Sequence, residues 1–452
     1  MSENSIRHPK NLRKLKKMLH RLTSHFGDVP AMGWLLAGLV IALLERFAGS
    51  SLAYVLGLSK LPALFGSLVF FAKPSLHFPF IFNDLATIAA VIVYDLLIYV
   101  IPMLVVTKFT IGIANRISAA LFNRSSLLSI LVHLLLLYLV LWQWTDVSTY
   151  RGLVTRLTMI AVLITLSLNI INGYMGEFSA SHPGFIAVGA YAASIFTIAM
   201  FTDSTLFGAA KLPASLAPFF FPVALILGGA AAALSALIVA IPSFRTRGDY
   251  LAIISLAFMF IVKSFFENLE FAGGPRGLGG QPNLASLPVI FIWMILGIWI
   301  INNFVRSTFG KALNSVRDDE LAADAMTVNT RQTKMTAFLF GAFWAGVAGG
   351  LLAHVLRYIN PGSFGLQKLA EVLAMVYFGG LNSVLGSIVG AVSMNLLGEA
   401  LRPLELYKWI VIPVILILVM IYRPTGLIAF REFDIANIVK PKTHKEGDDA
   451  AS

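Results

Sequence analysis

The sequence predicts an all-α polytopic membrane protein with about ten to twelve transmembrane or re-entrant helices. Of the 452 residues, 58% are hydrophobic and only 13% are charged. The mean hydropathy is +0.81, far above that of a soluble domain of average composition. Apolar runs of spanning length recur along the chain, and they must form helices because lipid satisfies no backbone hydrogen bonds. A membrane β-barrel would instead show short segments of alternating polarity.

The apolar runs define the candidate helices in chain order. They are residues 31–48, 85–106, 127–144, 153–171, 185–200, 219–241, 250–267, 287–304, 335–355, 369–380, 384–401 and 409–422. The short run at 369–380 and the interrupted stretch at 173–184 are candidates for re-entrant segments. The positive-inside rule and the even number of crossings place both termini in the cytoplasm.

Charge and composition divide the chain into parts. A basic cytoplasmic segment, 1–30, precedes N-terminal helices in 31–150, a core in 151–430 and a cytoplasmic tail in 431–452. No small-residue cleavage site follows the first apolar run, so we expect a retained helix there. The net charge of +11 fits inward-facing loops and tails beside anionic lipid rather than nucleic-acid binding. The absence of cysteine excludes disulfides, thiolate metal sites and cysteine nucleophiles.

A long polar stretch, 306–334, interrupts the apolar second half of the chain. Charged residues such as Lys311 and Asp324 cannot lie in hydrocarbon without a cost of several kcal/mol each. Apolar residues such as Leu313 and Val316 nevertheless recur at helical spacing. The stretch therefore predicts an amphipathic helix on the cytoplasmic side, with an alanine-rich face that needs a partner. A helical loop that is merely solvated is the alternative.

Residues 172–184 combine glycine, proline and polar side chains between two apolar runs. Glycine and proline interrupt a helix there, and irregular backbone at membrane depth must be covered by protein or by a water-filled cavity. A broken helix beside a transport path and a short cytoplasmic turn both fit. For the polar candidates the alternative role is interhelical hydrogen bonding, and for the later glycines it is close helix approach. The candidate path residues are Gly173, Gly176, Ser179, Ser181, His182, Gly184, Asp249, Gly379 and Gly380.

Ionisable residues in the predicted helices leave a second function class open. A secondary transporter or channel without an ATPase could use such charges for ion coupling. The candidates for that role are Asp95, Lys263, Arg357 and Glu371. A membrane enzyme is disfavoured, since His182 lacks metal-ligand spacing to other histidines and no nucleophile–base pattern stands out. Lys311 is followed by alanine rather than by Ser or Thr, so we expect no ATP site and no cofactor on this chain.

Five motifs occur in order along the second part of the chain. They are Asn169–Tyr191, Arg245–Ile253, Gly273–Gly277, Arg317–Met326 and Tyr422–Leu427. Together they resemble the M-type permease subunits of branched-chain amino acid ABC importers, over about Thr158–Phe430. Residues 31–150 are only loosely similar to the variable N-terminal region of such permeases.

The resemblance implies a type II-like ABC import permease fold and a transport subunit, not an enzyme, in the bacterial inner membrane. It implies half of a translocation path for branched-chain or other hydrophobic amino acids, with urea or short amides as an alternative cargo within the family. The implied partners are a homologous second permease subunit, two ATP-binding cassette subunits that carry ATP and Mg, and an extracytoplasmic substrate-binding protein.

The resemblance also assigns a coupling role to the polar stretch. The family's pattern, an EAA run followed by three residues and glycine, maps onto Leu321–Thr327. Leu321 replaces the acid of the pattern, and Thr327 replaces the glycine at which the helix ends. A threonine there is expected to keep a negative φ. The residues assigned to ATPase coupling are Arg317, Asp318, Asp319, Glu320, Leu321, Ala322, Ala323, Asp324, Met326 and Thr327.

Overall fold

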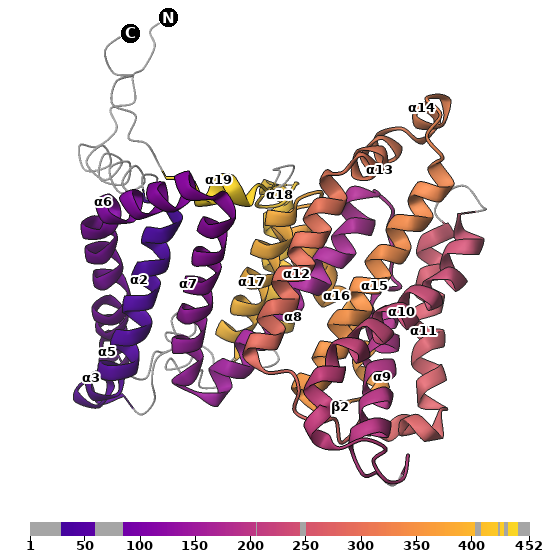
Figure 1. Ribbon diagram of the computed structural model, residues 1–452, viewed down its shortest axis with the longest axis horizontal. Helices are drawn as coiled ribbons and strands as arrows, with labels where there is room; N and C mark the ends of the chain where they lie inside the picture. The colour runs from indigo at the N-terminus through magenta and orange to yellow at the C-terminus, as the bar shows by residue number, and fades with distance from the viewer. Residues whose placement is uncertain are drawn as a thin grey trace, which may run out of the picture. The chain divides into compact units, whose positions relative to one another are not determined.

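The computed structural model describes residues 29–58, 85–204, 206–244, 250–402, 408–423, 425–428 and 433–441. These residues are almost entirely helical, and two short strands, β1 (Leu278–Gly279) and β2 (Tyr358–Ile359), pair antiparallel. The chain separates into two compact units (Figure 1). The first contains the described residues up to 147 together with 434–441, and the second contains those from 148 to 433.

The first unit is a small helical bundle in which α2 packs against α6 and α7. Its elements are α2 (Ala31–Leu44), η1 (Glu45–Gly49), α3 (Ser50–Val55), α5 (Leu85–Asp95), η2 (Leu96–Val100), α6 (Ile101–Arg124), α7 (Ser126–Asp146) and α19 (Ile435–Val439). The second apolar run ends at residue 106, but α6 continues as helix through Lys108 and Arg116 to Arg124. A charge ends a membrane span but does not end a helix, since lysine and arginine are good helix formers.

The second unit holds the predicted core region. Its elements are α8 (Thr149–Asn169), η3 (Ile170–Tyr174), α9 (His182–Phe201), η4 (Ala214–Leu216), α10 (Ala217–Ser243), α11 (Tyr250–Glu267), η5 (Glu270–Ala272), η6 (Gly274–Arg276), α12 (Leu287–Arg306), α13 (Thr308–Asp318), α14 (Glu320–Ala325), α15 (Thr330–Leu356), η7 (Pro361–Phe364), α16 (Leu366–Gly379), α17 (Val384–Ala400) and α18 (Lys408–Tyr422). The helices α9, α10 and α15 pack on one another at its centre, and α8 packs against α12, α15 and α17.

Small buried residues line the contacts between α9, α10 and α15. Ala190, Ala193, Ala232, Ala236 and Ala345 are all 0% exposed. Small side chains let helix backbones approach closely, which is how helices associate where lipid offers no hydrophobic drive between them. The centre of this unit is therefore tightly packed rather than an open channel.

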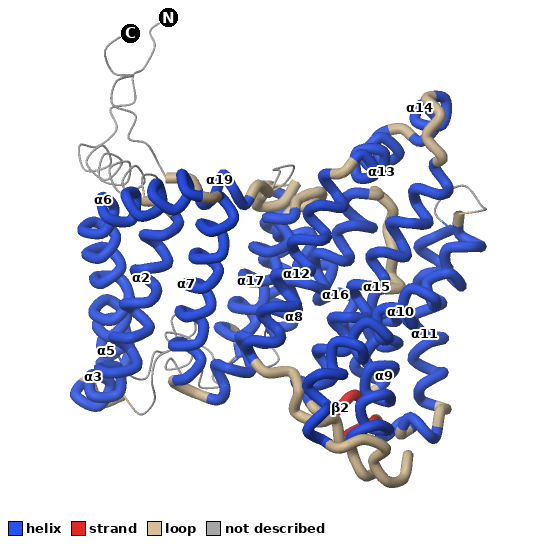
Figure 2. Tube along the Cα trace, viewed as in Figure 1, coloured by secondary structure: helices blue, strands red, loops and turns tan. Residues whose placement is uncertain are grey.

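Nine helical stretches among the described residues are long and apolar enough to cross a membrane, and the two shorter helices α17 and α18 are also apolar. Almost all of the remaining structure is helix or loop, as Figure 2 shows. The prediction of an all-α polytopic membrane protein is confirmed. Residues 1–28 of the basic segment, residues 59–84 between the first two predicted runs and the last residues of the tail lie outside the described residues.

Candidate functional site

A break in the helical structure lies between α8 and α9. The helix α8 ends at Asn169, a π-helical turn carries the chain to Tyr174, and the next helix begins only at His182. Ser179 and Ser181 are 0% exposed and Ala180 is 2% exposed. The irregular backbone is therefore covered by protein, the condition under which such backbone persists at membrane depth.

The polar residues of the break form hydrogen bonds inside the helix bundle. The hydroxyls of Ser179 and Ser181 lie 2.8 Å apart, and the Asn172 side-chain oxygen accepts from the Ser179 backbone N–H at 3.3 Å. The Ser167 hydroxyl and Nε2 of His182 are also 2.8 Å apart. Ser179, Ser181 and His182 thus make the interhelical and local hydrogen bonds that are the alternative to a role in transport. Their part in a transport path stays a prediction.

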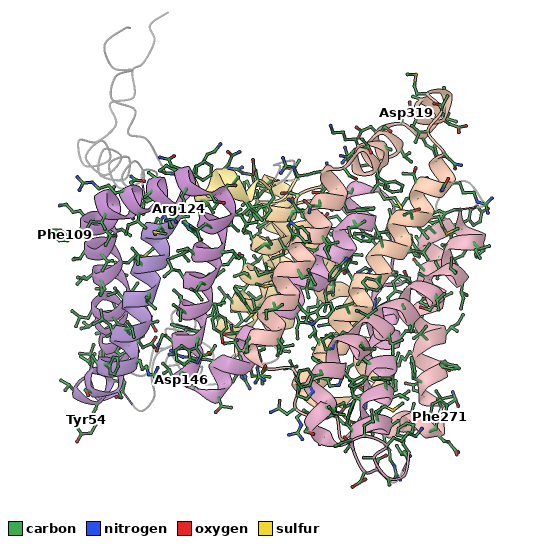
Figure 3. All side chains as sticks on the ribbon, viewed as in Figure 1. Tyr54, Phe109, Arg124, Asp146, Phe271 and Asp319 are labelled. Atoms are coloured by element: carbon green, nitrogen blue, oxygen red, sulfur yellow. The ribbon has the colours of Figure 1, made fainter. Side chains whose placement is uncertain are left out.

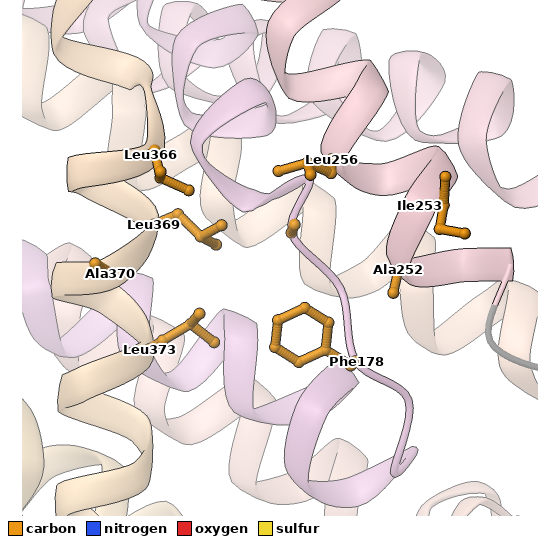
Figure 4. A pocket seen from close by; sticks show the side chains of 9 residues that line it. Phe178, Ala252, Ile253, Leu256, Leu366, Leu369, Ala370 and Leu373 are labelled. Carbon is orange, nitrogen blue, oxygen red and sulfur yellow. The ribbon is translucent and has the colours of Figure 1, made fainter. Parts of the chain in front are cut away.

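The apolar residues of the break line a pocket. Phe178 and Ala180 are among the lining residues of this pocket of about 410 Å³, and the hydrogen-bonded serines Ser179 and Ser181 are not. Figure 4 shows Phe178 reaching from the break toward Leu369 and Leu373 on α16. The nine lining residues are Phe178, Ala180, Ala252, Ile253, Leu256, Leu366, Leu369, Ala370 and Leu373. All are apolar, and α11, α16 and the break each contribute to them.

Sequence reasoning missed this pocket. The residue types that line it are common in every membrane helix, so nothing in their composition marks a site. The one usable signal was the alternation of apolar and small polar residues from Phe178 to Ser181, because the apolar members line the pocket and the serines form hydrogen bonds.

The remaining predicted path residues lie in different places. Gly379 ends α16, where an added Cβ would lie 2.0 Å from the Gly386 carbonyl oxygen, so this glycine admits the backbone of α17. Gly380 follows it with φ 124°. Gly173 lies in η3 and Gly184 in the first turn of α9. Asp249 lies outside the described residues.

The polar stretch forms two helices at one end of the second unit. Figure 3 shows Asp319, the residue between α13 and α14, beyond the ends of the neighbouring long helices. The Asp319 carboxylate caps α14 by accepting from the backbone N–H groups of Leu321 at 2.9 Å and of Ala322 at 3.0 Å. The expectation of one helix through this stretch is therefore wrong. Asp319 has φ −158°, and an aspartate cap starts a new helix there.

The end of α14 departs from expectation in its backbone. Thr327 has φ 67°, so the expected negative φ is wrong. Its backbone N–H donates to the Asp324 carbonyl at 3.0 Å, and that of Val328 donates to the Ala323 carbonyl at 3.1 Å. The helix closes with a left-handed residue, the position where glycine is most often found. The threonine thus occupies the conformation that glycine would have.

The coupling candidates divide into buried and exposed residues. Ala323 is 4% exposed, because it packs toward the rest of the unit. Leu321 is 71% and Met326 is 77% exposed, and Ala322 is also exposed. Asp318, Asp319, Glu320, Asp324 and Thr327 are exposed as well, and Arg317 is partly buried. Leu321 of α14 and Met326 at its end are thus two large apolar side chains that the described residues leave exposed.

The helix pair, α13 and α14, is joined to the break in two ways, through Lys334 and by a direct contact of Arg317. The ammonium of Lys334, in α15, lies 2.7 Å from Glu177 Oε1 and 2.7 Å from Glu320 Oε2. A Cβ on Gly176 would lie 2.4 Å from Cγ of Arg317. The two regions that the sequence singled out separately are therefore joined in the structure.

The charges proposed for ion coupling have separate partners. Lys263 lies 3.7 Å from Glu267 on its own helix, and Glu371 lies 3.1 Å from Lys368 on α16. Nε of Arg357 donates to the Gln281 carbonyl at 3.2 Å. Asp95 belongs to the first unit. The three charges of the second unit thus serve three local contacts rather than one shared site.

Residues 150–420 match the family model described as branched-chain amino acid transport system, permease component. The high-affinity branched-chain amino acid transport system permease protein LivM of Escherichia coli (strain K12) is 30% identical over 310 residues, covering 61% of this chain and 69% of the relative. The LivH permease protein of the same strain is 31% identical over 150 residues, 32% of this chain and 48% of the relative. BraD of Pseudomonas aeruginosa is 28% identical over 169 residues, 36% and 54% of the two chains. No solved structure gives a significant match.

Proposed function

Because the chain belongs to the family of permease components of branched-chain amino acid transport systems, we propose that it forms half of the translocation path of an ATP-driven importer. The proposed cargo is a branched-chain or other hydrophobic amino acid. The second half comes from a homologous permease subunit. Two ATP-binding cassette subunits supply ATP and Mg, and an extracytoplasmic binding protein delivers the cargo.

The observation that carries this proposal is the exposed tip of α14. Leu321 and Met326 are 71% and 77% exposed at the end of a helix pair that projects beyond the long helices (Figure 3). Large apolar side chains exposed beside charged ones are typical of protein contact surfaces. An ATPase subunit in the cytoplasm would cover them, which puts this end of the second unit on the cytoplasmic side of the bacterial inner membrane. The positive-inside rule, applied to the basic ends of the sequence, supports the further proposal that both termini are cytoplasmic.

The apolar pocket supports the choice of cargo. Its lining of leucines, an isoleucine, a phenylalanine and alanines offers an aliphatic side chain apolar contacts. Burial of such a side chain contributes about 1.5–3 kcal/mol. Urea and short amides would lose hydrogen bonds to water there without replacement, at a cost of about 1–3 kcal/mol per group. The pocket therefore favours leucine, isoleucine and valine over urea.

In this proposal, transport occurs by alternating access, and the ATPase subunits drive it. Closure of the ATPase dimer moves the helix pair, and the movement shifts the permease between its two states. Such a shift requires that the dimer bind the two states with different affinity.

Purification of the tagged chain in mild detergent with its neighbouring subunits tests the proposal. We expect ATPase subunits to copurify, and the complex in liposomes to take up labelled leucine only with ATP. A charged residue at the tip, Leu321→Glu or Ala322→Glu, should abolish copurification. Leu206→Glu, at a side chain that is 48% exposed outside the helix pair, is the matched control and should leave copurification intact.

A secondary transporter makes the opposite prediction. The chain alone, reconstituted without any ATPase, would then accumulate leucine in response to an ion gradient. That outcome, or copurification that survives Leu321→Glu and Ala322→Glu alike, would overturn the coupling role of α14.

A further inference from the structure

One lysine joins the exposed helix pair to the helix break. Lys334, in the second turn of α15, is bonded at 2.7 Å to Glu177 of the break and at 2.7 Å to Glu320 of α14. Glu177 lies 157 positions from Lys334 in the sequence, whereas Glu320 lies 14 positions from it. The side chain of Lys334 is only 10% exposed. An ammonium this buried is stable only while its carboxylates stay in place.

A second contact joins the same two regions. Gly176 has φ 76°, and an added Cβ would lie within 2.4 Å of Arg317 Cγ and 3.2 Å of its Cβ. The stem of Arg317, near the end of α13, thus rests directly on the backbone of the break. The helix α13 therefore contacts the break directly at Gly176, and α14 is joined to the next residue, Glu177, through Lys334 of α15.

The next residue along the chain belongs to the pocket. Phe178 is 45% exposed and forms one wall of it (Figure 4). Glu177 is joined to α14 through Lys334, and its neighbour in the chain, Phe178, lines the pocket.

We propose that Lys334 is a positioning residue that fixes the break to α14, so that displacement of the helix pair moves Phe178 at the wall of the apolar pocket. If α14 shifts, Lys334 must either carry Glu177 with it or lose one of its two ion pairs. That loss is unfavourable because the Lys334 side chain is only 10% exposed, although Glu320 is 51% exposed. The short backbone path from Glu177 to Phe178 turns that movement into a change of the pocket. This inference rests on the proposed coupling of the helix pair to an ATPase.

The first test measures transport and ATP hydrolysis together in the complete reconstituted complex. Lys334→Met should leave assembly and ATP hydrolysis in place while leucine uptake per ATP falls about five-fold or more, the usual size of a lost coupling between sites. Lys334→Arg keeps the charge and should restore most of the coupling. Lys263→Met is the matched control: it removes a lysine whose ion pair, 3.7 Å to Glu267, stays within α11. It should keep uptake per ATP unchanged.

The second test follows Phe178 directly. The chain contains no cysteine, so Phe178→Cys introduces a single thiol, and the mass of this chain reports its reaction with a maleimide. We expect the labelling rate to differ about five-fold between nucleotide-free and ATP-bound complexes. Adding Lys334→Met should remove that difference, and adding Lys334→Arg should keep it. The control is Phe271→Cys, at a 53% exposed residue of η5. Its thiol should react at the same rate in the nucleotide-free and ATP-bound complexes.

Two results would overturn the inference. One is undiminished uptake per ATP in Lys334→Met, and the other is nucleotide-dependent labelling at position 178 that survives this substitution. A third result would also contradict the inference: if Lys334→Met lowered assembly, ATP hydrolysis and uptake in the same proportion, and Lys334→Arg restored all three equally, Lys334 would serve folding alone. Failure of the proposed function is a different result, because wild type itself would then show no ATP-dependent uptake.

Discussion

Gly176 and Arg317 are in direct contact. A Cβ added to Gly176 would lie only 2.4 Å from Arg317 Cγ, so there is no room for a side chain at this position. The glycine also has φ 76°, a conformation that costs a residue with a side chain about 1–2 kcal/mol. Gly176→Ala should therefore destabilise the protein by about 2 kcal/mol in thermal unfolding in detergent.

The two causes of that loss can be separated. Arg317→Ala removes the steric conflict but not the backbone strain, so the double variant should regain part of the stability lost in Gly176→Ala. Gly398→Ala in α17 is the control, since nothing lies within 4 Å of its built Cβ. It should leave stability unchanged or raise it by about 0.5–1 kcal/mol. Equal effects of the two glycine substitutions would contradict the contact.

Thr327 ends α14 with φ 67°, where a β-branched residue is strained. Thr327→Gly should relieve about 1–2 kcal/mol, offset by the greater flexibility of glycine in the unfolded chain, about 0.5–1 kcal/mol. We expect a small net gain in thermal stability and retained ATPase copurification. Thr327→Pro fixes φ near −65° and removes the N–H that donates to the Asp324 carbonyl. It should therefore reduce both the thermal stability and the copurification of the ATPase. Tolerance of proline would show that the left-handed turn is not needed for docking.

Ser167 and His182 are both 0% exposed and lie 2.8 Å apart. The Ser167 hydroxyl also lies 2.8 Å from the Ile164 carbonyl oxygen of its own helix. Ser167→Ala should destabilise by about 1 kcal/mol, as for buried bonds between membrane helices. The double variant Ser167→Ala/His182→Leu removes both partners and should lose less than the sum of the single variants.

The control for that cycle is Thr158→Val in the same helix. The Thr158 hydroxyl donates only to the Val154 carbonyl of its own helix, at 2.9 Å, among the contacts described. Its loss should change stability by less than that of Ser167. Strict additivity of the Ser167 and His182 substitutions would show that their contact contributes no stability.

Helix positions were predictable because a membrane span has one strong signal, a long apolar run, and lipid permits only helix there. Each predicted run from 127 onward falls on a helix of the structure. The signal fails where a helix leaves the apolar region, as in α6, whose basic end at Arg124 remains helical. It fails again at Asp319, where a capping side chain rather than polarity decides that one helix ends and another begins.

The candidate site was less accessible to sequence reasoning because it depends on long-range packing. The break was visible from its glycines and proline, but its polar residues bond into the bundle while Phe178 and Ala180 line the pocket. The contact of Lys334 with Glu177 spans 157 positions. No local pattern can report which two charges of a chain meet across such a distance.

The size of the pocket should set the preference among hydrophobic amino acids. Ala252→Phe introduces a ring into a pocket of about 410 Å³ and should weaken leucine uptake about ten-fold through KM, with ATPase copurification intact. Ala257→Phe, on the same helix but outside the lining, is exposed and should leave KM unchanged. Phe178→Ala enlarges the pocket and should raise phenylalanine uptake relative to leucine about ten-fold. If Ala252→Phe and Ala257→Phe behaved alike, or if Phe178→Ala left the preference unchanged, the pocket would not hold the cargo side chain.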